Sequence, residues 1–143
     1  MTGPTIIPHL NVNDGEAALA FYEKAFGAKT EVKMPAQDGK RLMHASLSLN
    51  GGTIMLHDDF PEYDGMGGTK SAARLGGTAV VIHLETPDTD AAFDRATKAG
   101  ASVIMKPENM FWGARYAQIK DPFGHIWSIG GPVTGGELKQ VTM

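Results

Sequence analysis

The histidines are the side chains of this chain best suited to chemistry near neutral pH, because an imidazole ordinarily titrates there. The sequence holds five histidines and no cysteine. His9, His44, His57 and His83 lie in segments where apolar and polar residues alternate, which is typical of strands with one buried face. In each segment the histidine falls on the polar side. We therefore expect four imidazoles on sheet faces, whereas His125 lies in a turn and has an expected structural role.

Composition limits the classes of partner and chemistry. The lack of cysteine excludes disulfides, zinc knuckles and thiol nucleophiles. The net charge is -3 and the basic residues are scattered, so we expect no nucleic-acid and no membrane partner. No signal-peptide pattern or long apolar run is present, so the expected location is the cytoplasm. A chain of 143 residues with 42% hydrophobic residues suits one domain with its own core.

The elements that must position these histidines follow a β-α-β-β-β order that occurs twice. The predicted domain consists of a first module over residues 5–57, a connector or lid over 58–77, a second module over 78–130 and a tail over 131–143. In the first module, strands are predicted over 5–12, 29–34, 42–49 and 53–57, with a helix from Asp14 to Gly27. In the second, strands are predicted over 78–85 and 102–105, with a helix from Asp88 to Gly100 and a hairpin over 111–130.

Residues as well as patterns repeat between the modules. The helix start Asp14-x-Glu16-Ala17-Ala18-Leu19 matches Asp88-x-Asp90-Ala91-Ala92-Phe93, and both helices end at Gly-Ala. Between the modules periodicity disappears, and Asp, Pro and Gly dominate. Long segments of this kind are often functional, which favours a connector or a lid over a regular element.

The paired modules and the Asp-Pro-Phe-Gly-His turn at 121–125 resemble the vicinal-oxygen-chelate superfamily of glyoxalases, bleomycin-resistance proteins and dioxygenases. Within it the chain resembles the PhnB-like branch. The motifs that carry the resemblance include Pro8-His9-Leu10, Ala20-Phe21-Tyr22, Met43-His44-Ala45 and Phe111-Trp112-Gly113. The resemblance implies an α+β fold in which two βαβββ modules form a curved mixed sheet, with helices on the convex face and a ligand cleft on the concave face.

The resemblance also implies where a metal would bind. Metal-dependent relatives take ligands from positions that fall on Ile7, Met55, Val81 and Ser128. Ile and Val have no donor atom, a thioether is soft and a neutral hydroxyl is a poor ligand, so we expect no metal at these positions. The cofactor stays unknown, and a displaced site at His9 and His83, with Glu85 or His57, stays open.

Two functions follow as alternatives. The first is a protein that binds or sequesters a small organic ligand without the usual metal site. The second is a metal-dependent lyase, isomerase or glutathione transferase that uses the displaced histidines. No catalytic residue is identified, and a homodimer is expected because relatives of this size complete their clefts by pairing. The predicted ligand-binding residues are His9, His44, Met55, His57, His83, Glu85, Trp112, Arg115 and Tyr116.

Overall fold

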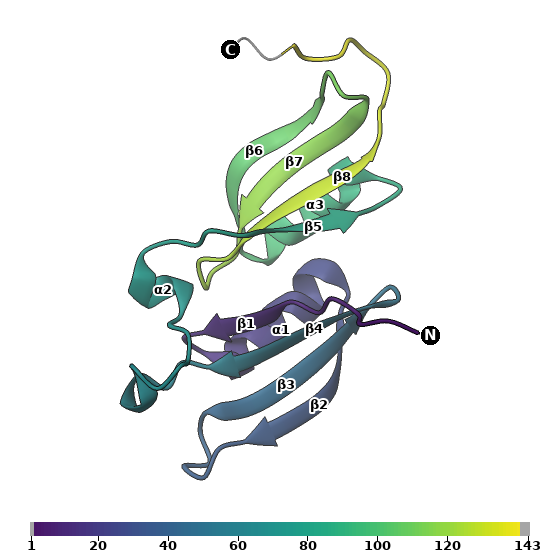
Figure 1. The fold of residues 1–143 in the computed structure, drawn as a ribbon. Helices are drawn as coiled ribbons and strands as arrows, with labels where there is room; N and C mark the ends of the chain where they lie inside the picture. The colour runs from purple at the N-terminus through teal and green to yellow at the C-terminus, as the bar shows by residue number, and fades with distance from the viewer. Residues whose placement is uncertain (1, 141–143) are drawn as a thin grey trace. The chain divides into compact units, whose positions relative to one another are not determined.

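A computed structural model describes residues 2–140 of the chain. The chain divides after Gly77 into two compact units, and each is described by itself. In Figure 1 the colour runs from purple to teal in the first unit and from teal to yellow in the second. No helix among the described residues is both long and apolar enough to cross a membrane.

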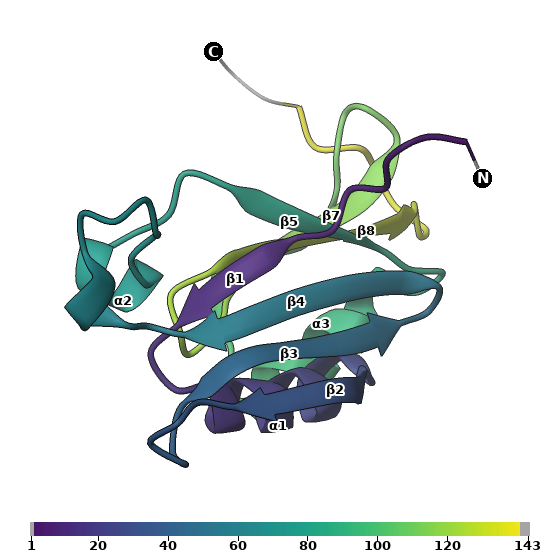
Figure 2. The ribbon, with the colours of Figure 1, turned by 60° about the horizontal axis from the view of Figure 1, so that its bottom comes forward.

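The first unit is a four-stranded mixed sheet with a helix on one face (Figures 1 and 2). The strand order is β1-β4-β3-β2, where β1 is parallel to β4 and the other neighbours are antiparallel. Its elements are β1 (His9–Val12), α1 (Gly15–Phe26), β2 (Lys29–Pro35), β3 (Leu42–Leu49), β4 (Gly52–Asp58), a 3-10 turn η1 (Pro61–Tyr63) and α2 (Ala72–Leu75).

Capping and burial explain the position of α1. The Asp14 carboxylate accepts a hydrogen bond from the Ala17 amide at 3.1 Å, and Gly27 ends the helix in the left-handed region at φ 74°. The helix packs on β2, β3 and β4. Its Tyr22 is fully buried, as are Leu47 and Leu56 of the sheet, and these side chains form the core of the unit.

The second unit repeats this topology with the strand order β5-β8-β7-β6. Its elements are β5 (Val81–Glu85), α3 (Thr89–Ala99), β6 (Ser102–Asn109), β7 (Ala114–Lys120) and β8 (Ile126–Pro132). The β7–β8 turn is held by the buried Asp121 carboxylate, which accepts hydrogen bonds from the Phe123 and His125 amides and, at 2.9 Å, from the indole of buried Trp127. The turn motif therefore anchors the core of this unit.

The predicted α+β class with two βαβββ modules is confirmed, whereas several boundaries differ. β1 and β5 begin at His9 and Val81, later than predicted, and β6 continues to Asn109. Residues 58–77 were expected to lack regular elements, which is wrong because they contain η1 and α2. The four-residue α2 is too short to show periodicity, although its Ser71 cap and terminal Gly76 are ordinary helix signals.

The predicted tail over 131–143 also differs in its first residues. β8 includes Gly131 and Pro132, and the Asn109 side chain exchanges hydrogen bonds of 3.0 and 3.1 Å with the backbone of Thr134. Residues 141–143 lie outside the described residues.

Candidate functional site

Three histidines gather on the face of the first sheet that α1 leaves uncovered. Strand alternation buries Leu10, Leu47 and Leu56 on the helix side and leaves His9, His44 and His57 on the other. The His9 ring meets the His57 ring edge to face at 5.1 Å between centroids, and the His44 ring at 6.0 Å. Met55 lies on β4 directly opposite His9 and is half-buried.

Burial and crowding change the electrostatics of His9. The pKa of His9 is lowered from its ordinary 6.5, first by burial and then by the neighbouring His57 and His44, because a charged ring would lose solvent and face like charges. His57 is oriented differently: its Nδ1 lies 2.7 Å from the Asp58 carbonyl oxygen, which can only accept. Nδ1 therefore carries the proton, and Nε2 of the neutral His57 ring is an acceptor.

A hollow of about 220 Å³ lies beside His57. Besides His57 and Asn11 of the sheet, it is lined mainly by the connector. Asn11 is buried and its amide donates to the carbonyl and hydroxyl oxygens of Thr69 at 2.8 and 3.1 Å. Sequence reasoning missed the connector residues, although two aromatic side chains in a segment rich in Asp and Gly were a signal. The lining residues are Asn11, Met43, His57, Phe60, Tyr63, Gly68 and Thr69.

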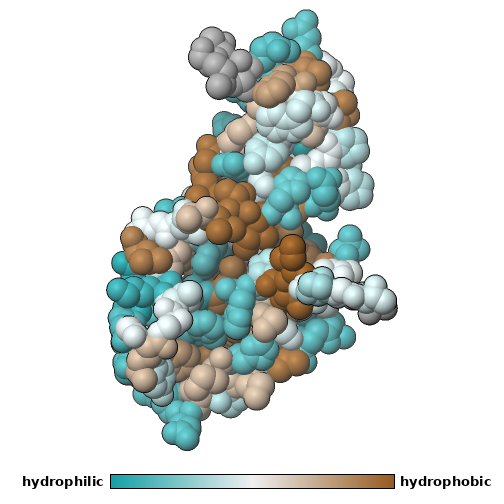
Figure 3. Space-filling model, viewed as in Figure 1, coloured by the Kyte–Doolittle hydropathy of each residue, from teal (hydrophilic) through white to brown (hydrophobic). Residues whose placement is uncertain are grey.

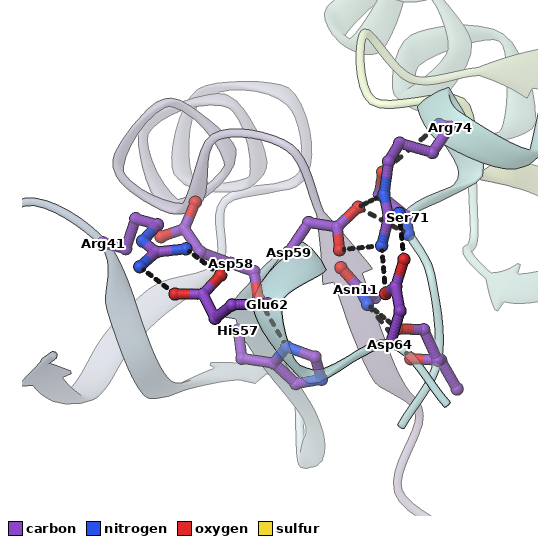
Figure 4. Close-up of polar contacts among 10 residues, drawn as sticks. Asn11, Arg41, His57, Asp58, Asp59, Glu62, Asp64, Ser71 and Arg74 are labelled. Carbon is purple, nitrogen blue, oxygen red and sulfur yellow. Dashed lines mark hydrogen bonds and ion pairs between the residues drawn. The ribbon is translucent and has the colours of Figure 1, made fainter. Parts of the chain in front are cut away.

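Two arginines hold the connector through its carboxylates (Figure 4). Arg74 binds the Asp59 carboxylate at 2.6 and 2.7 Å and the Asp64 carboxylate at 2.7 and 2.9 Å. These hydrogen bonds hold the pKa values of both carboxyls below their usual range. Arg41 binds both Glu62 oxygens at 2.9 and 2.6 Å and lowers the pKa of that carboxyl to about 2.

In the second unit, His83 is held by hydrogen bonds through both ring nitrogens. Its Nε2 lies 2.6 Å from a Glu85 carboxylate oxygen, and its Nδ1 lies 2.7 Å from the Ser128 hydroxyl. An ionised carboxylate only accepts, so in the neutral imidazole Nε2 carries the proton and the Ser128 hydroxyl donates to Nδ1. A Cβ at Gly130 would come within 2.8 Å of His83 Cε1, so the absence of a side chain there leaves room for the ring.

An exposed aromatic cluster adjoins His83. The Tyr116 ring stacks on the His83 ring at 6.2 Å and 13°, and the Trp112 ring meets Tyr116 edge to face at 5.4 Å. Phe111 packs edge to face on Trp112 at 5.0 Å, and Trp112 is 51% exposed. Gln118 donates to the Tyr116 hydroxyl at 2.9 Å, which orients that ring. Apolar side chains also gather on the surface of this unit near β5 (Figure 3).

Arg115 lies apart from this cluster. Its guanidinium binds the Asp90 carboxylate of α3 at 2.6 and 2.9 Å and lowers the pKa of Asp90. Along β7, Arg115 shares its face with Ala117 and Ile119, which are buried on the helix side, whereas Tyr116 faces the other way. The strand alternation itself places Arg115 on the helix side, away from the aromatic cluster.

The residues at the family's metal positions do not fit a divalent metal. Ile7 and Val81 offer no donor atom, Met55 offers only a thioether, and the Ser128 hydroxyl is committed to His83. Both nitrogens of His83 also have partners. Within residues 2–140, no group of three or more His, Asp or Glu side chains is arranged to hold a metal ion.

Comparisons with known proteins agree with this architecture. Residues 6–129 match the model of the Glyoxalase/Bleomycin resistance protein/Dioxygenase superfamily. Uncharacterized proteins of Mycobacterium bovis and Mycobacterium tuberculosis are 49% identical over 138 residues, covering 96% of this chain and 90% and 80% of theirs.

Solved structures resemble the chain over most of its length. TioX from a Micromonospora species is 25% identical with a TM-score of 0.71, covering 92% of this chain and all of that one. Protein PA1353 from Pseudomonas aeruginosa is 26% identical with a TM-score of 0.69, covering 91% of this chain and 98% of its own. With the family match over residues 6–129, the chain belongs to the glyoxalase/bleomycin resistance protein/dioxygenase superfamily.

Proposed function

We propose that this protein binds a small planar organic molecule, and that the uncovered sheet face of the second unit supplies the contact. The observation that carries the proposal is the cluster in which half-exposed Trp112 packs against Tyr116, and Tyr116 against His83. Aromatic rings held by their neighbours offer a large apolar contact area at a low cost in side-chain entropy. A planar ligand would stack on this cluster.

Polar groups beside the rings would orient the ligand. Glu85 is exposed and held by His83, so its carboxylate offers an acceptor at the edge of the aromatic cluster. In the first unit, His9, His44, His57 and Met55 provide a second uncovered face, which we propose also contacts ligand. Assignment to the PhnB-like branch stays part of this proposal and rests on the sequence motifs alone.

The two tryptophans make a direct test possible, because each gives one indole N–H signal in an NMR spectrum. Caffeine is a suitable probe, since it is planar, soluble and lacks a hydrogen-bond donor. We expect caffeine to shift the Trp112 signal and to leave the signal of fully buried Trp127 in place. Trp112→Phe should weaken caffeine binding by roughly 1 kcal/mol while the fold survives.

Thermal unfolding of Trp112→Phe serves as the control. If this variant loses several kcal/mol of stability while caffeine affinity is unchanged, Trp112 is a core residue and the proposal fails. A Trp112 signal that caffeine does not move at any soluble concentration would also refute the proposal.

A proton-transfer enzyme is the second candidate, because the exposed Glu85 carboxylate accepts a 2.6 Å hydrogen bond from His83, which Ser128 orients. Such a pair suits a lyase or isomerase that removes a proton next to a carbonyl. Deuterium incorporation into the pyruvate methyl group in D2O tests this idea. The second candidate predicts catalysed exchange that Glu85→Gln abolishes, and exchange at the uncatalysed rate would remove it.

A displaced metal site has its own test. Elemental analysis of the purified protein, together with a thermal-shift series of divalent metals, would reveal a bound ion. Stoichiometric zinc, nickel or manganese that is lost in the His9→Ala/His83→Ala double variant would favour a metal-dependent lyase, isomerase or glutathione transferase. We expect the double variant to lose stability with no change in metal content.

We also propose that the protein is a homodimer. β1 and β2 end the first sheet, and β5 and β6 end the second, so each sheet has two terminal strands able to pair. Sedimentation that shows a monomer at micromolar concentration would overturn this proposal. A cytoplasmic location and the absence of nucleic-acid and membrane partners stay predictions from composition.

A further inference from the structure

We propose that the hollow beneath the connector of the first unit binds a single aromatic ring that carries a hydrogen-bond donor, as in a phenol. The hollow shares His57 with the first-unit face named under the proposed function. This site lies wholly within residues 11–69 and does not depend on the aromatic face of the second unit. The size of the hollow, its lining and the acceptor that His57 contributes together carry the inference.

The size and walls of the hollow define the ligand class. Its volume of about 220 Å³ is below the range of roughly 300–1,000 Å³ typical for drug-sized ligands, so it suits one ring. Phe60, Tyr63 and Met43 supply apolar and adaptable walls. Gly68 lines the same space and has no side chain to fill it.

His57 supplies the polar selectivity. Because its Nδ1 donates to the Asp58 carbonyl oxygen, Nε2 of the neutral ring is left as an acceptor. No residue within 2–140 hydrogen-bonds to this nitrogen. The His9 ring packs edge to face on His57 and limits its rotation. A ligand hydroxyl is therefore favoured over an ether of the same shape, which has no proton to donate.

The connector walls are positioned before any ligand arrives. The Arg41 guanidinium lies 4.4 Å from the centre of the Phe60 ring and binds Glu62 on the following turn. Arg74 gathers Asp59 and Asp64, the residues that flank η1 on either side (Figure 4). Ordering these walls in advance lowers the entropy lost on binding. Arg41 and Arg74 are thus positioning residues that do not touch the ring.

The first test compares phenol with anisole on the full chain by NMR, following the Gly68 amide and the imidazole nitrogens of His57. We expect phenol to shift both sets of signals and to bind roughly five-fold more tightly than anisole, which lacks the donor. His57→Phe should remove this preference, whereas His125→Phe, a matched change in the β7–β8 turn, should keep it. Equal affinity for phenol and anisole in the wild-type protein would overturn the proposal without relying on any variant.

The role of the arginines has a separate readout. Phenol is uncharged, so added salt has no direct ionic contact with the ligand to screen, whereas it weakens the exposed ion pairs of the connector. We expect added salt to weaken phenol binding to the wild-type protein and to have a smaller effect on Arg74→Gln. A salt response that is the same in both proteins would show that Arg74 does not position the site.

The two indole signals separate this inference from the proposed function. If phenol shifts the Gly68 amide signal and leaves the Trp112 indole signal in place, the hollow is supported as a site. This outcome does not depend on whether caffeine binds. Phenol that shifts only the Trp112 indole overturns the hollow as a site and leaves the proposed function standing.

Discussion

The two units share a topology and differ in what lies opposite an equivalent histidine. His9 lies on β1 opposite Met55 of β4, and His83 lies on β5 opposite Ser128 of β8. A thioether gives His9 no strong hydrogen bond, whereas the Ser128 hydroxyl binds His83 at 2.7 Å. One residue on the neighbouring strand therefore decides whether the imidazole is pinned in place or only packed.

The next register pair widens the difference. Asn11 lies opposite His57 in the first unit, and Glu85 lies opposite Gly130 in the second. The pKa of His9 is lowered first by burial and then by the His57 ring beside it. In the second unit Gly130 has no side chain, and the His83 ring occupies the corresponding space and reaches Glu85. The same fold thus makes one face rich in crowded imidazoles and the other a fixed His–Glu pair among aromatic rings.

The largest expected effect concerns how each helix start is tied to its sheet. Buried Asp58 accepts hydrogen bonds from the Gly15 and Leu42 amides at 2.8 and 2.6 Å, whereas in the second unit the Thr89 hydroxyl donates to the Arg115 carbonyl oxygen at 2.9 Å. Asp58→Ala leaves two amides without their acceptor and should cost roughly 2–5 kcal/mol. Thr89→Ala should cost about 1 kcal/mol.

Urea unfolding of both variants measures this difference. If Asp58→Ala lowers the free energy of unfolding by no more than Thr89→Ala does, the two units tie their helix starts to the sheet equally strongly. Asp58→Asn, which keeps one acceptor oxygen, should fall between Asp58→Ala and the wild-type protein.

The second prediction tests the space that Gly130 leaves. Gly130→Ala brings a methyl group against His83 Cε1, so the ring must move away from Glu85 or Ser128. We expect a loss of about 1–3 kcal/mol and changed nitrogen shifts of His83 in NMR spectra. Gly77→Ala, where a Cβ meets nothing within 4 Å, is the matched control. Unchanged His83 shifts in Gly130→Ala would contradict the assigned role.

The third prediction compares the ion pairs between helix and sheet. Arg115 binds Asp90 through two nitrogens with its own side chain 20% exposed, whereas Lys33 binds Glu16 at about half exposure for both. We expect Arg115→Ala to cost about 1 kcal/mol, and Lys33→Ala less than about 0.5 kcal/mol. Denaturant midpoints measure both losses of stability, provided that the variants unfold with the same denaturant dependence as the wild-type protein. Equal losses would show that geometry and exposure do not make one ion pair stronger than the other.

The smallest expected effect is a pH dependence in the first unit. The folded-state pKa of His9 is below 6.5, so the unfolded chain takes up the proton first as pH falls. The contribution to stability is therefore present above pH 6.5 and declines as the pH falls through the lowered pKa of folded His9. An NMR titration of His9 should show this lowered pKa, and replacing His44 or His57 by Gln should raise it.

His125→Gln serves as the control for the titration, because it changes a histidine of the second unit. It should leave the pKa of His9 unchanged. A His9 pKa that does not rise in either His44→Gln or His57→Gln would show that like charges do not contribute.

Local patterns in the sequence determined the elements and the faces of the strands. Asp14 and Gly27 bound α1 as their cap preferences predict, because a cap is a contact between residues three or four apart. Alternation along β4 separates buried Leu56 from His57, because successive side chains of a strand point to opposite faces. The same rule applied strictly to β7 would have assigned Arg115 to the helix side.

Only the tertiary structure decided which of these side chains meet. The stacking of Tyr116 on His83, the link from His83 to Ser128 and the binding of Arg74 to Asp59 and Asp64 join residues from different strands or different turns. Their partners depend on strand register and on the path of the connector, which are set by packing of the whole unit. Sequence periodicity fixes the face of each side chain but leaves register shifts of two residues undecided, so the hollow at His57 and the pinned imidazole of His83 emerge only once the strands are paired.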